Sequence, residues 1–247
     1  MRVAAVIPAA GIGRRMKTAL SKQFLTLGGR PVLWHALSVF EASPLIDEIV
    51  VVLSAQDREF AEARLFSAHP FRKIRALVEG GPRRSDSVLN GLRSLGSGVE
   101  LVVIHDGCRP FASEQMIRDT LSAAKETGGA ITALPLGDTL KRERADRLIA
   151  ETVDRKGMWQ AQTPQAFRLP LLLQAFQYAA AEKIEATDES MLFEALGLPV
   201  RLVTGSPFNI KLTLPEDLAL AESIYHLLKG SQEAGVSQAG DENRNRF

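Results

Sequence analysis

The chain contains 247 residues, of which 45% are hydrophobic, 24% charged and 6% aromatic, a composition that excludes a disordered or collagen-like chain. This length allows one large domain with a sizeable core that needs no disulfide or metal to be stable. Lys plus Arg (30) and Asp plus Glu (29) leave a net charge of +1, which argues against nucleic-acid binding by bulk electrostatics. Any anion-binding site must therefore be local.

Cysteine usage and hydropathy indicate a cytoplasmic protein. Cys108 is the sole cysteine, which excludes an intrachain disulfide and a cysteine zinc cluster and suits a reducing compartment. The apolar run 3–7 is broken by Pro8 and is read as a first strand, not as a signal sequence. No apolar stretch approaches the roughly 18 residues of a membrane helix, so we expect no membrane association.

Short runs rich in Val, Ile and Leu alternate with segments of helical apolar spacing, which predicts an α/β fold with a mostly parallel sheet covered by helices. The predicted strands are 3–7, 48–54, 74–79, 101–105, 129–134 and 200–204. The predicted helices are 31–43, 55–66, 84–95, 113–126, 170–181, 188–195 and 215–228.

Two segments break this alternation. Residues 138–153 are too charged for a core strand and are interpreted as an arm projecting from the sheet. A solvated hairpin and a hairpin that crosses to a second subunit are both compatible with it. Residues 230–247 have few apolar side chains and are predicted to be a flexible polar tail, which leaves 1–229 as a single domain.

The first strand leads into the most informative loop, residues 8–16, which reads Pro-Ala-Ala-Gly-Ile-Gly-Arg-Arg-Met. Small residues at the carboxyl end of a parallel strand let a ligand approach the backbone, whose N–H groups can hold phosphate oxygens. Arg14, Arg15 and Lys22 add positive charge. Met16 stands where the dinucleotide fingerprint needs its third glycine, and no Gly-Lys-Ser/Thr forms a P-loop. We therefore expect a polyphosphate site of another kind.

Two further loops follow predicted strands. Residues 80–88 carry glycines and the hydroxyl of Ser87, which would suit either close ligand approach or ordinary helix capping. In residues 105–110, Asp106 follows an apolar run at the sheet edge where α/β proteins bind ligands, and a carboxylate beside phosphates suits Mg²⁺. Arg109 adds an anion donor. His105 is a candidate general base, although a structural, hydrogen-bonded histidine is an equal reading.

Other polar groups are dispersed along the chain. They could serve as caps, turns or ion pairs, or together bind a second phosphate-bearing substrate. These are Asp138-Thr139, Asp154-Arg155, Gln162-Thr163-Pro164-Gln165, Thr187-Asp188 and Asn209-Ile210-Lys211-Leu212-Thr213.

The ordered set of these motifs resembles one enzyme family, the 2-C-methyl-D-erythritol 4-phosphate cytidylyltransferases of the non-mevalonate isoprenoid pathway. The likeness covers residues 3 to about 228 and runs from Pro-Ala-Ala-Gly-x-Gly-x-Arg-Met through Gly-Gly-x-x-Arg-x-x-Ser-Val and His-Asp-x-x-Arg-Pro to Asn-Ile-Lys-x-Thr. It implies a Rossmann-like (GT-A-like) nucleotidyltransferase sheet with a β-arm that forms a homodimer. It also implies transfer of the cytidylyl group of CTP to methylerythritol phosphate, with Mg²⁺ and release of pyrophosphate.

The resemblance also implies roles for individual residues. Arg15 and Lys22, with Arg155 and Lys211, would be catalytic, and Asp106 would lie near Mg²⁺ and the substrate. The implied nucleotide-binding residues are Ala9, Ala10, Gly11, Gly13, Gly81 and Ser87. The implied acceptor-binding residues are Asp106, Arg109, Thr163, Thr187 and Lys211, with Thr139 and Arg155 from the partner's arm.

One position departs from the family, because Pro82 stands where many relatives carry an acidic residue and it offers no N–H donor. Three alternatives remain open at the sequence level. One is a cytidylyltransferase for another polyol phosphate such as ribitol 5-phosphate, another is a sugar-phosphate nucleotidyltransferase, and the last is a non-catalytic nucleotide-binding protein on the same fold.

Overall fold

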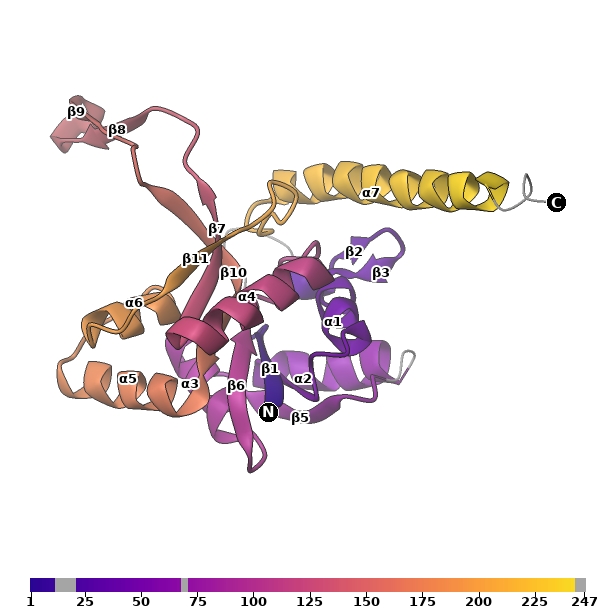
Figure 1. Ribbon diagram of the computed structural model, residues 1–247, viewed down its shortest axis with the longest axis horizontal. Coiled ribbons are helices and arrows are strands. Elements are labelled where there is room, and N and C mark those ends of the chain that lie inside the picture. The colour runs from indigo at the N-terminus through magenta and orange to yellow at the C-terminus, as the bar shows by residue number, and fades with distance from the viewer. Residues whose placement is uncertain (12–20, 68–70, 243–247) are drawn as a thin grey trace.

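The computed structural model describes residues 1–11, 21–67 and 71–242, with the backbone alone from 231 onward. Its central sheet has seven strands in the order β11-β7-β10-β6-β1-β4-β5 (Figure 1). These strands are β1 (Arg2–Pro8), β4 (Glu48–Leu53), β5 (Ile74–Glu79), β6 (Val99–Ile104), β7 (Gly129–Pro135), β10 (Trp159–Arg168) and β11 (Arg201–Thr204). Only β10 is antiparallel to its neighbours, so the predicted mostly parallel α/β sheet is confirmed.

Strand β10 is the one strand of this sheet that sequence reasoning missed. It reads Trp-Gln-Ala-Gln-Thr-Pro-Gln-Ala-Phe-Arg, and its pairing register with β7 shifts between Ala161 and Gln165. A strand interrupted by Pro and three glutamines gives neither a continuous apolar run nor an alternating one. The polar side chains of β10 indicate instead that this part of the sheet carries a functional site.

Seven α-helices accompany the described strands. They are α1 (Val32–Ala42), α2 (Ala55–Ala61), α3 (Arg84–Arg93), α4 (Glu114–Thr127), α5 (Leu169–Ala181), α6 (Glu189–Ala195) and α7 (Pro215–Glu242). Each of the seven overlaps one of the predicted helical segments. The predicted helix 55–66 is corrected in its second half, because α2 ends at Ala61 and a π-helical turn, Glu62–Phe66, follows it.

The sheet has a buried core on each face, which explains the continuous apolar runs of its strands. On one face, Leu37 of α1 and Leu121 of α4 pack with Ile7 of β1. On the other face, Val88 of α3 and Phe176 of α5 pack with strand residues of the opposite pleat. Helices on both faces leave the carboxyl edge of the parallel strands free to carry a site.

Helix α7 extends beyond the end predicted for it. Sequence reasoning ends this helix at Leu228, whereas the helical backbone continues to Glu242, through most of the segment predicted to be a tail. Figure 1 shows α7 (yellow) reaching away from the sheet. No helix in the described part of the chain is both long and apolar enough to cross a membrane.

The predicted projecting arm is a two-stranded hairpin. Its strands β8 (Leu140–Glu143) and β9 (Ile149–Val153) pair antiparallel around the turn Ala145–Arg147. Figure 1 shows the hairpin standing clear of the sheet, beyond the ends of β7 and β10. A second small hairpin, β2 (Thr26–Leu27) and β3 (Arg30–Pro31), was not predicted and packs against α7.

Candidate active site

Backbone hydrogen bonds align the carboxyl ends of the parallel strands. The N–H of Ala9, after β1, donates to the carbonyl of Val52 in β4 (2.7 Å), and the N–H of Gly80, after β5, donates to Leu53 (2.8 Å). The N–H of Gly107, after β6, donates to the carbonyl of Pro8 (3.1 Å). The three loops that the sequence singled out therefore meet at one edge of the sheet.

Two adjoining clefts open at this edge. The larger, of about 600 Å³, lies over the loops that follow β1 and β5. The smaller, of about 200 Å³, lies over β10 and the start of α6. Arg84, Asp106 and Lys211 line both clefts and so form the boundary between them.

The larger cleft contains most of the predicted nucleotide-binding residues. Those within the described ranges are Ala9, Ala10, Gly11, Gly81 and Ser87, and all five line it. The hydroxyl of Ser87 accepts from the N–H of Gly81 (3.0 Å) and so holds the glycine turn against α3. A Cβ at Gly80 would collide with the Cβ of Ala10. Small residues are therefore required where the two loops face each other.

Of the predicted catalytic cations, Lys22 and Lys211 line the larger cleft. The Nζ of Lys22 donates to the carbonyl of Leu212 (3.0 Å), which places it beside the segment that carries Lys211. Arg15, predicted to be catalytic, and Gly13, predicted to bind the nucleotide, lie outside the described residues.

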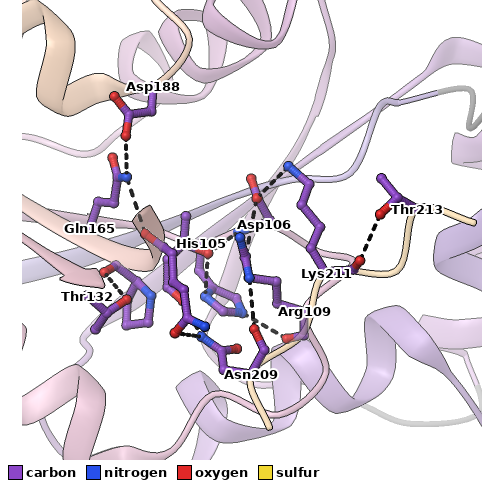
Figure 2. Close-up of polar contacts among 12 residues, drawn as sticks. His105, Asp106, Arg109, Thr132, Gln165, Asp188, Asn209, Lys211 and Thr213 are labelled. Carbon is purple, nitrogen blue, oxygen red and sulfur yellow. Dashed lines mark hydrogen bonds and ion pairs between the residues drawn. The ribbon is translucent and has the colours of Figure 1, made fainter. Parts of the chain in front are cut away.

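Asp106 is the anionic centre of the boundary between the clefts and is 5% exposed. Its Oδ1 accepts from Nε of Arg84 (3.0 Å), its Oδ2 lies 2.8 Å from Nζ of Lys211, and Nε of Arg109 lies 3.6 Å away. Figure 2 shows Lys211 and Arg109 converging on this carboxylate. Burial alone would raise the pKa of Asp106, but Arg84, Lys211 and Arg109 hold it well below its usual range. Asp106 is therefore ionised at neutral pH.

Arg84 is an important residue that sequence reasoning did not select. Its Nη1 donates to both carboxylate oxygens of Glu189 (2.8 and 2.9 Å), a side chain that is 1% exposed. Although burial opposes it, Glu189 and Asp106 together raise the pKa of the guanidinium. The pairing joins residues 105 apart in the sequence, so no local pattern could have indicated it.

His105 is part of a hydrogen-bonded chain that leaves it no role as a base. Its Nε2 donates to the carbonyl of Arg109 (3.0 Å), and its Nδ1 accepts from the hydroxyl of Thr163 (3.0 Å). That hydroxyl in turn accepts from the N–H of Asp106 (3.0 Å). Burial lowers the pKa of His105 to about 4. The structural reading of this histidine therefore holds, and the imidazole fixes the loop that carries Asp106.

The smaller cleft gathers the other predicted acceptor-binding residues, Arg109, Thr163 and Thr187. The fully buried Asn209 organises this side. Its Nδ2 donates to the carbonyl of Thr163 (2.8 Å). Its backbone carbonyl accepts from Nη1 of Arg109 (2.8 Å), as Figure 2 shows. The sequence indicates Asn209 only as part of a dispersed motif. Its role depends on contacts with residues 46 and 100 positions away.

The remaining two predicted acceptor-binding residues lie elsewhere. Thr139 and Arg155 are exposed on the two segments that join the arm to the sheet. Neither residue lines either cleft of this chain. The single chain therefore does not bring Thr139 and Arg155 to its own clefts.

The carboxylates and thiol of the described residues do not form a preformed metal site. Within residues 1–11, 21–67 and 71–242, no group of three or more His, Cys, Asp or Glu side chains is placed to hold a metal ion. Both oxygens of Asp106 already face cations, so a metal ligated there would displace Lys211 or Arg84. The metal role of Asp106 therefore remains a prediction.

Burial, reinforced by Asp106, raises the pKa of the buried Cys108 and keeps it a thiol.

The fold and the cation-lined clefts at its carboxyl edge define an α/β nucleotidyltransferase, an enzyme class in which fixed charges act on phosphate groups. The family model for IspD, 2-C-methyl-D-erythritol 4-phosphate cytidylyltransferase, matches residues 3–226. The chain belongs to this family.

Individual relatives agree over nearly the whole chain. The chain is 45% identical to the 2-C-methyl-D-erythritol 4-phosphate cytidylyltransferase of Geobacter metallireducens, covering 90% of this chain and 97% of the relative. It is 44% identical to the Syntrophus aciditrophicus protein of the same name, covering 93% and 98%. The crystal structure of 4-diphosphocytidyl-2C-methyl-D-erythritol synthase from Anaerococcus prevotii superposes with a TM-score of 0.80 at 33% identity, covering 91% and 96%.

Proposed function

We propose that this protein transfers the cytidylyl group of CTP to 2-C-methyl-D-erythritol 4-phosphate. A phosphate oxygen of the acceptor forms a bond to the α-phosphorus of CTP, the bond from that phosphorus to the bridging oxygen breaks, and pyrophosphate leaves with the electron pair. The products are 4-diphosphocytidyl-2-C-methyl-D-erythritol and pyrophosphate. The observation that carries this proposal is that two clefts share a boundary of Arg84, Asp106 and Lys211. Two phosphorylated substrates can meet there.

In this proposal the larger cleft binds CTP. Small residues in the loops after β1 and β5 let the nucleotide approach the backbone, whose N–H groups can donate to it. Pro82 also lines this cleft and supplies no N–H, so contacts to the base there must come from its neighbours Gly81 and Arg83. Larger side chains at Gly80 would close the space between the loops.

The smaller cleft binds methylerythritol phosphate. Arg109 and Lys211 supply positive charge, and the hydroxyls of Thr163 and Thr187 add polar groups for the polyol. Arg109 is oriented by Asn209, and Lys211 by Asp106, so the cations are held in place before substrate arrives. Such preorganisation reduces the entropic cost of bringing the two substrates together.

Catalysis then consists of positioning and charge stabilisation. Both substrates are anionic and repel each other unless cations lie between them. Four cations are proposed to stabilise the negative charge that grows on the phosphoryl oxygens and on the leaving pyrophosphate. They are Lys22, Lys211, Arg15 and the partner subunit's Arg155. The attacking phosphate is already ionised at neutral pH, so the reaction needs no general base. Both ring nitrogens of His105 make hydrogen bonds within the protein, which agrees with a reaction that uses no histidine as a base.

In this proposal Mg²⁺ enters with the nucleotide and meets the protein beside Asp106. Mg²⁺ keeps several waters and commonly binds phosphate oxygens, so it would enter as the complex of Mg²⁺ with CTP and reduce the negative charge of the triphosphate. The ionised, cation-paired Asp106 lies at the boundary where this complex would approach the acceptor.

We further propose a cytoplasmic homodimer formed through the arm. The tip of the hairpin exposes Leu148 and Ile149, which are 49% and 63% exposed in the single chain. Apolar side chains at the end of a projecting hairpin favour burial against a second copy. Such a partner would bring Thr139 and Arg155 towards the acceptor cleft. The free, buried Cys108 suits a reducing compartment.

Pyrophosphate release by the purified protein tests the proposal. CTP with Mg²⁺ would be combined with methylerythritol phosphate or with ribitol 5-phosphate, and ATP, GTP and UTP would replace CTP in parallel. We expect release with CTP and methylerythritol phosphate alone. A preference for ribitol 5-phosphate would keep the chemistry and change the acceptor, and the absence of release with every pair would favour a nucleotide-binding protein.

A further inference from the structure

A buried carboxylate beside the larger cleft has no part in the roles described above. Asp57, in the first turn of α2, is 7% exposed. Its Oδ1 accepts a hydrogen bond from the hydroxyl of Ser21 (2.8 Å). Its Oδ2 accepts from Nε2 of Gln23 (3.0 Å) and from the hydroxyl of Ser54 (2.8 Å). One carboxylate thus organises three donors from two separate segments.

Two of these donors flank Lys22, and the third lines the same cleft as Lys22. Ser21 and Gln23 directly precede and follow it in the sequence, and Ser54 lines the larger cleft at the end of β4. Gln23 is 1% exposed, and its Nε2 also donates to the carbonyl of Ala9 (2.6 Å), just after β1. The turn that carries Lys22 is therefore tied to α2 and the end of β4 through the carboxylate of Asp57, and to the end of β1 through the side chain of Gln23.

The backbone around Lys22 forms a short 3₁₀ turn, Lys22–Phe24, with few hydrogen bonds of its own. The N–H of Phe24 donates to the carbonyl of Ser21 (2.9 Å), and the N–H of Leu25 donates to that of Lys22 (3.2 Å). A single turn of this kind has little intrinsic stability. Its position thus depends on the contacts that its side chains make.

We propose that Asp57 is a positioning residue for Lys22, fixing the turn so that Nζ is presented to the nucleotide cleft beside Leu212. This inference rests on the proposed function, in which Lys22 meets charge that develops in the transition state. A displacement of about 1 Å of such a group can cost on the order of 100-fold in rate. The carboxylate therefore acts through Lys22 and does not touch the substrate.

A purely structural role is the competing explanation. The hydroxyl of Ser54 accepts from the N–H of Asp57 (3.1 Å), so the pair also caps α2. Asp57→Asn distinguishes the two roles. The amide keeps the shape of the carboxylate but removes the charge and turns a donor towards Ser21, Gln23 or Ser54. Charge-assisted hydrogen bonds are about twice as strong as neutral ones, so the turn loses its anchor.

The test is a double-mutant cycle on pyrophosphate release with CTP, Mg²⁺ and methylerythritol phosphate. In the wild-type background, Asp57→Asn should lower kcat about 10- to 100-fold while the KM for CTP changes by less than about threefold. In the Lys22→Ala background it should lower kcat by less than about twofold, because the group it positions is absent. Full multiplication of the two effects would overturn the inference.

A second readout does not depend on activity. Lysine amines carrying ¹³C-methyl groups give individual NMR signals, and Lys22→Ala identifies the signal of Lys22. In Asp57→Asn this signal should move from its wild-type position, while that of Lys125, an exposed lysine on α4, should not. An unmoved Lys22 signal would overturn the inference. If the wild-type protein released no pyrophosphate, the proposed function would fail and this spectrum would still decide the role of Asp57.

Glu48→Gln is the matched control. Glu48 is also a buried carboxylate, 2% exposed, but it lies at the opposite end of β4, where it pairs with Arg2 and accepts from the N–H of Gly96 (3.1 Å). This variant should lower the melting temperature and leave both kcat and the Lys22 signal unchanged. The same pattern in Asp57→Asn, with a lowered melting temperature and unchanged kcat, would assign Asp57 to helix capping alone.

Discussion

The Nζ of Lys211 lies 2.8 Å from the Oδ2 of Asp106, and Nε of Arg84 lies 3.0 Å from the other oxygen of the same carboxylate. One ionised side chain therefore holds two cations at the boundary between the nucleotide and acceptor clefts. Without it, the positive charges gathered there would repel one another before any phosphate arrived. The arrangement explains why an acidic residue stands in a site built for anions.

Asp106→Asn should lower the free energy of unfolding by about 1–3 kcal/mol, because it leaves partly buried cations without their shared partner. Urea unfolding measures this loss. The pKa of Asp106 is lower in the folded protein than in the unfolded chain. The stabilisation that Asp106 provides is therefore complete above the unfolded pKa of aspartate, and it is lost as the pH falls from that value through the lowered pKa of the folded state. The control Asp119→Asn removes an exposed carboxylate on α4 and should change stability by less than about 0.5 kcal/mol. Equal losses in the two variants would contradict the central role of Asp106.

Lys22→Ala should reduce turnover by about 10²- to 10³-fold with little change in the KM for CTP, because the charge that Lys22 meets exists mainly in the transition state. Steady-state kinetics of pyrophosphate release measures both constants. Lys125→Ala, on the exposed face of α4, serves as the control for loss of a lysine. An unchanged kcat with a raised KM would show that Lys22 only binds the ground state.

His105 should make stability fall as the pH is lowered from about 6.5 to about 4. Its folded pKa of about 4 lies below the ordinary value of 6.5, so the unfolded chain takes up its proton first as the pH drops. The resulting loss is about 3 kcal/mol across this window. Urea unfolding of wild type and His105→Gln from pH 7 to pH 4.5 should show a shallower slope in the variant. His226→Gln, at an exposed position, should keep the wild-type slope.

Arg155→Ala and Lys22→Ala should complement each other if the arm completes the partner's site. In a heterodimer of these two chains, one site lacks both groups and the other keeps both, so about half of the wild-type activity should return. Heterodimers isolated with two different affinity tags, each assayed beside its inactive homodimers, measure this recovery. Demonstrated heterodimers without recovered activity would show that the sites are not shared.

Gly80→Ala should raise the KM for CTP by about tenfold or more, because its Cβ collides with the Cβ of Ala10 and pushes the two nucleotide loops apart. Steady-state kinetics with CTP as the varied substrate measures the change. The control is Gly230→Ala in α7, where an added Cβ meets no atom within 4 Å. A KM unaltered by Gly80→Ala would mean that the nucleotide does not use this loop pair.

Sequence patterns anticipated most of the fold because its buried strands are continuous apolar runs and its helices have amphipathic spacing. In the structure, Ser113 and Asp188 cap α4 and α6, because each side chain accepts from an N–H of the helix that it precedes. Strand β10 was missed because Gln162, Thr163 and Gln165, which line the smaller cleft, interrupt the apolar pattern expected of a core strand. The end of α7 escaped it because the segment after Leu228 lacks an apolar face.

The sequence by itself determined the α/β class, the loops that carry the site and, through ordered motifs, the family. Only the tertiary structure decided how the residues of those loops are paired. Arg84 meets Asp106 and Glu189, and Asp57 holds the residues on either side of Lys22, across gaps of 22 to 105 positions. Local sequence specifies backbone preference and burial, whereas the partner of a charged side chain depends on which strand ends the sheet brings together.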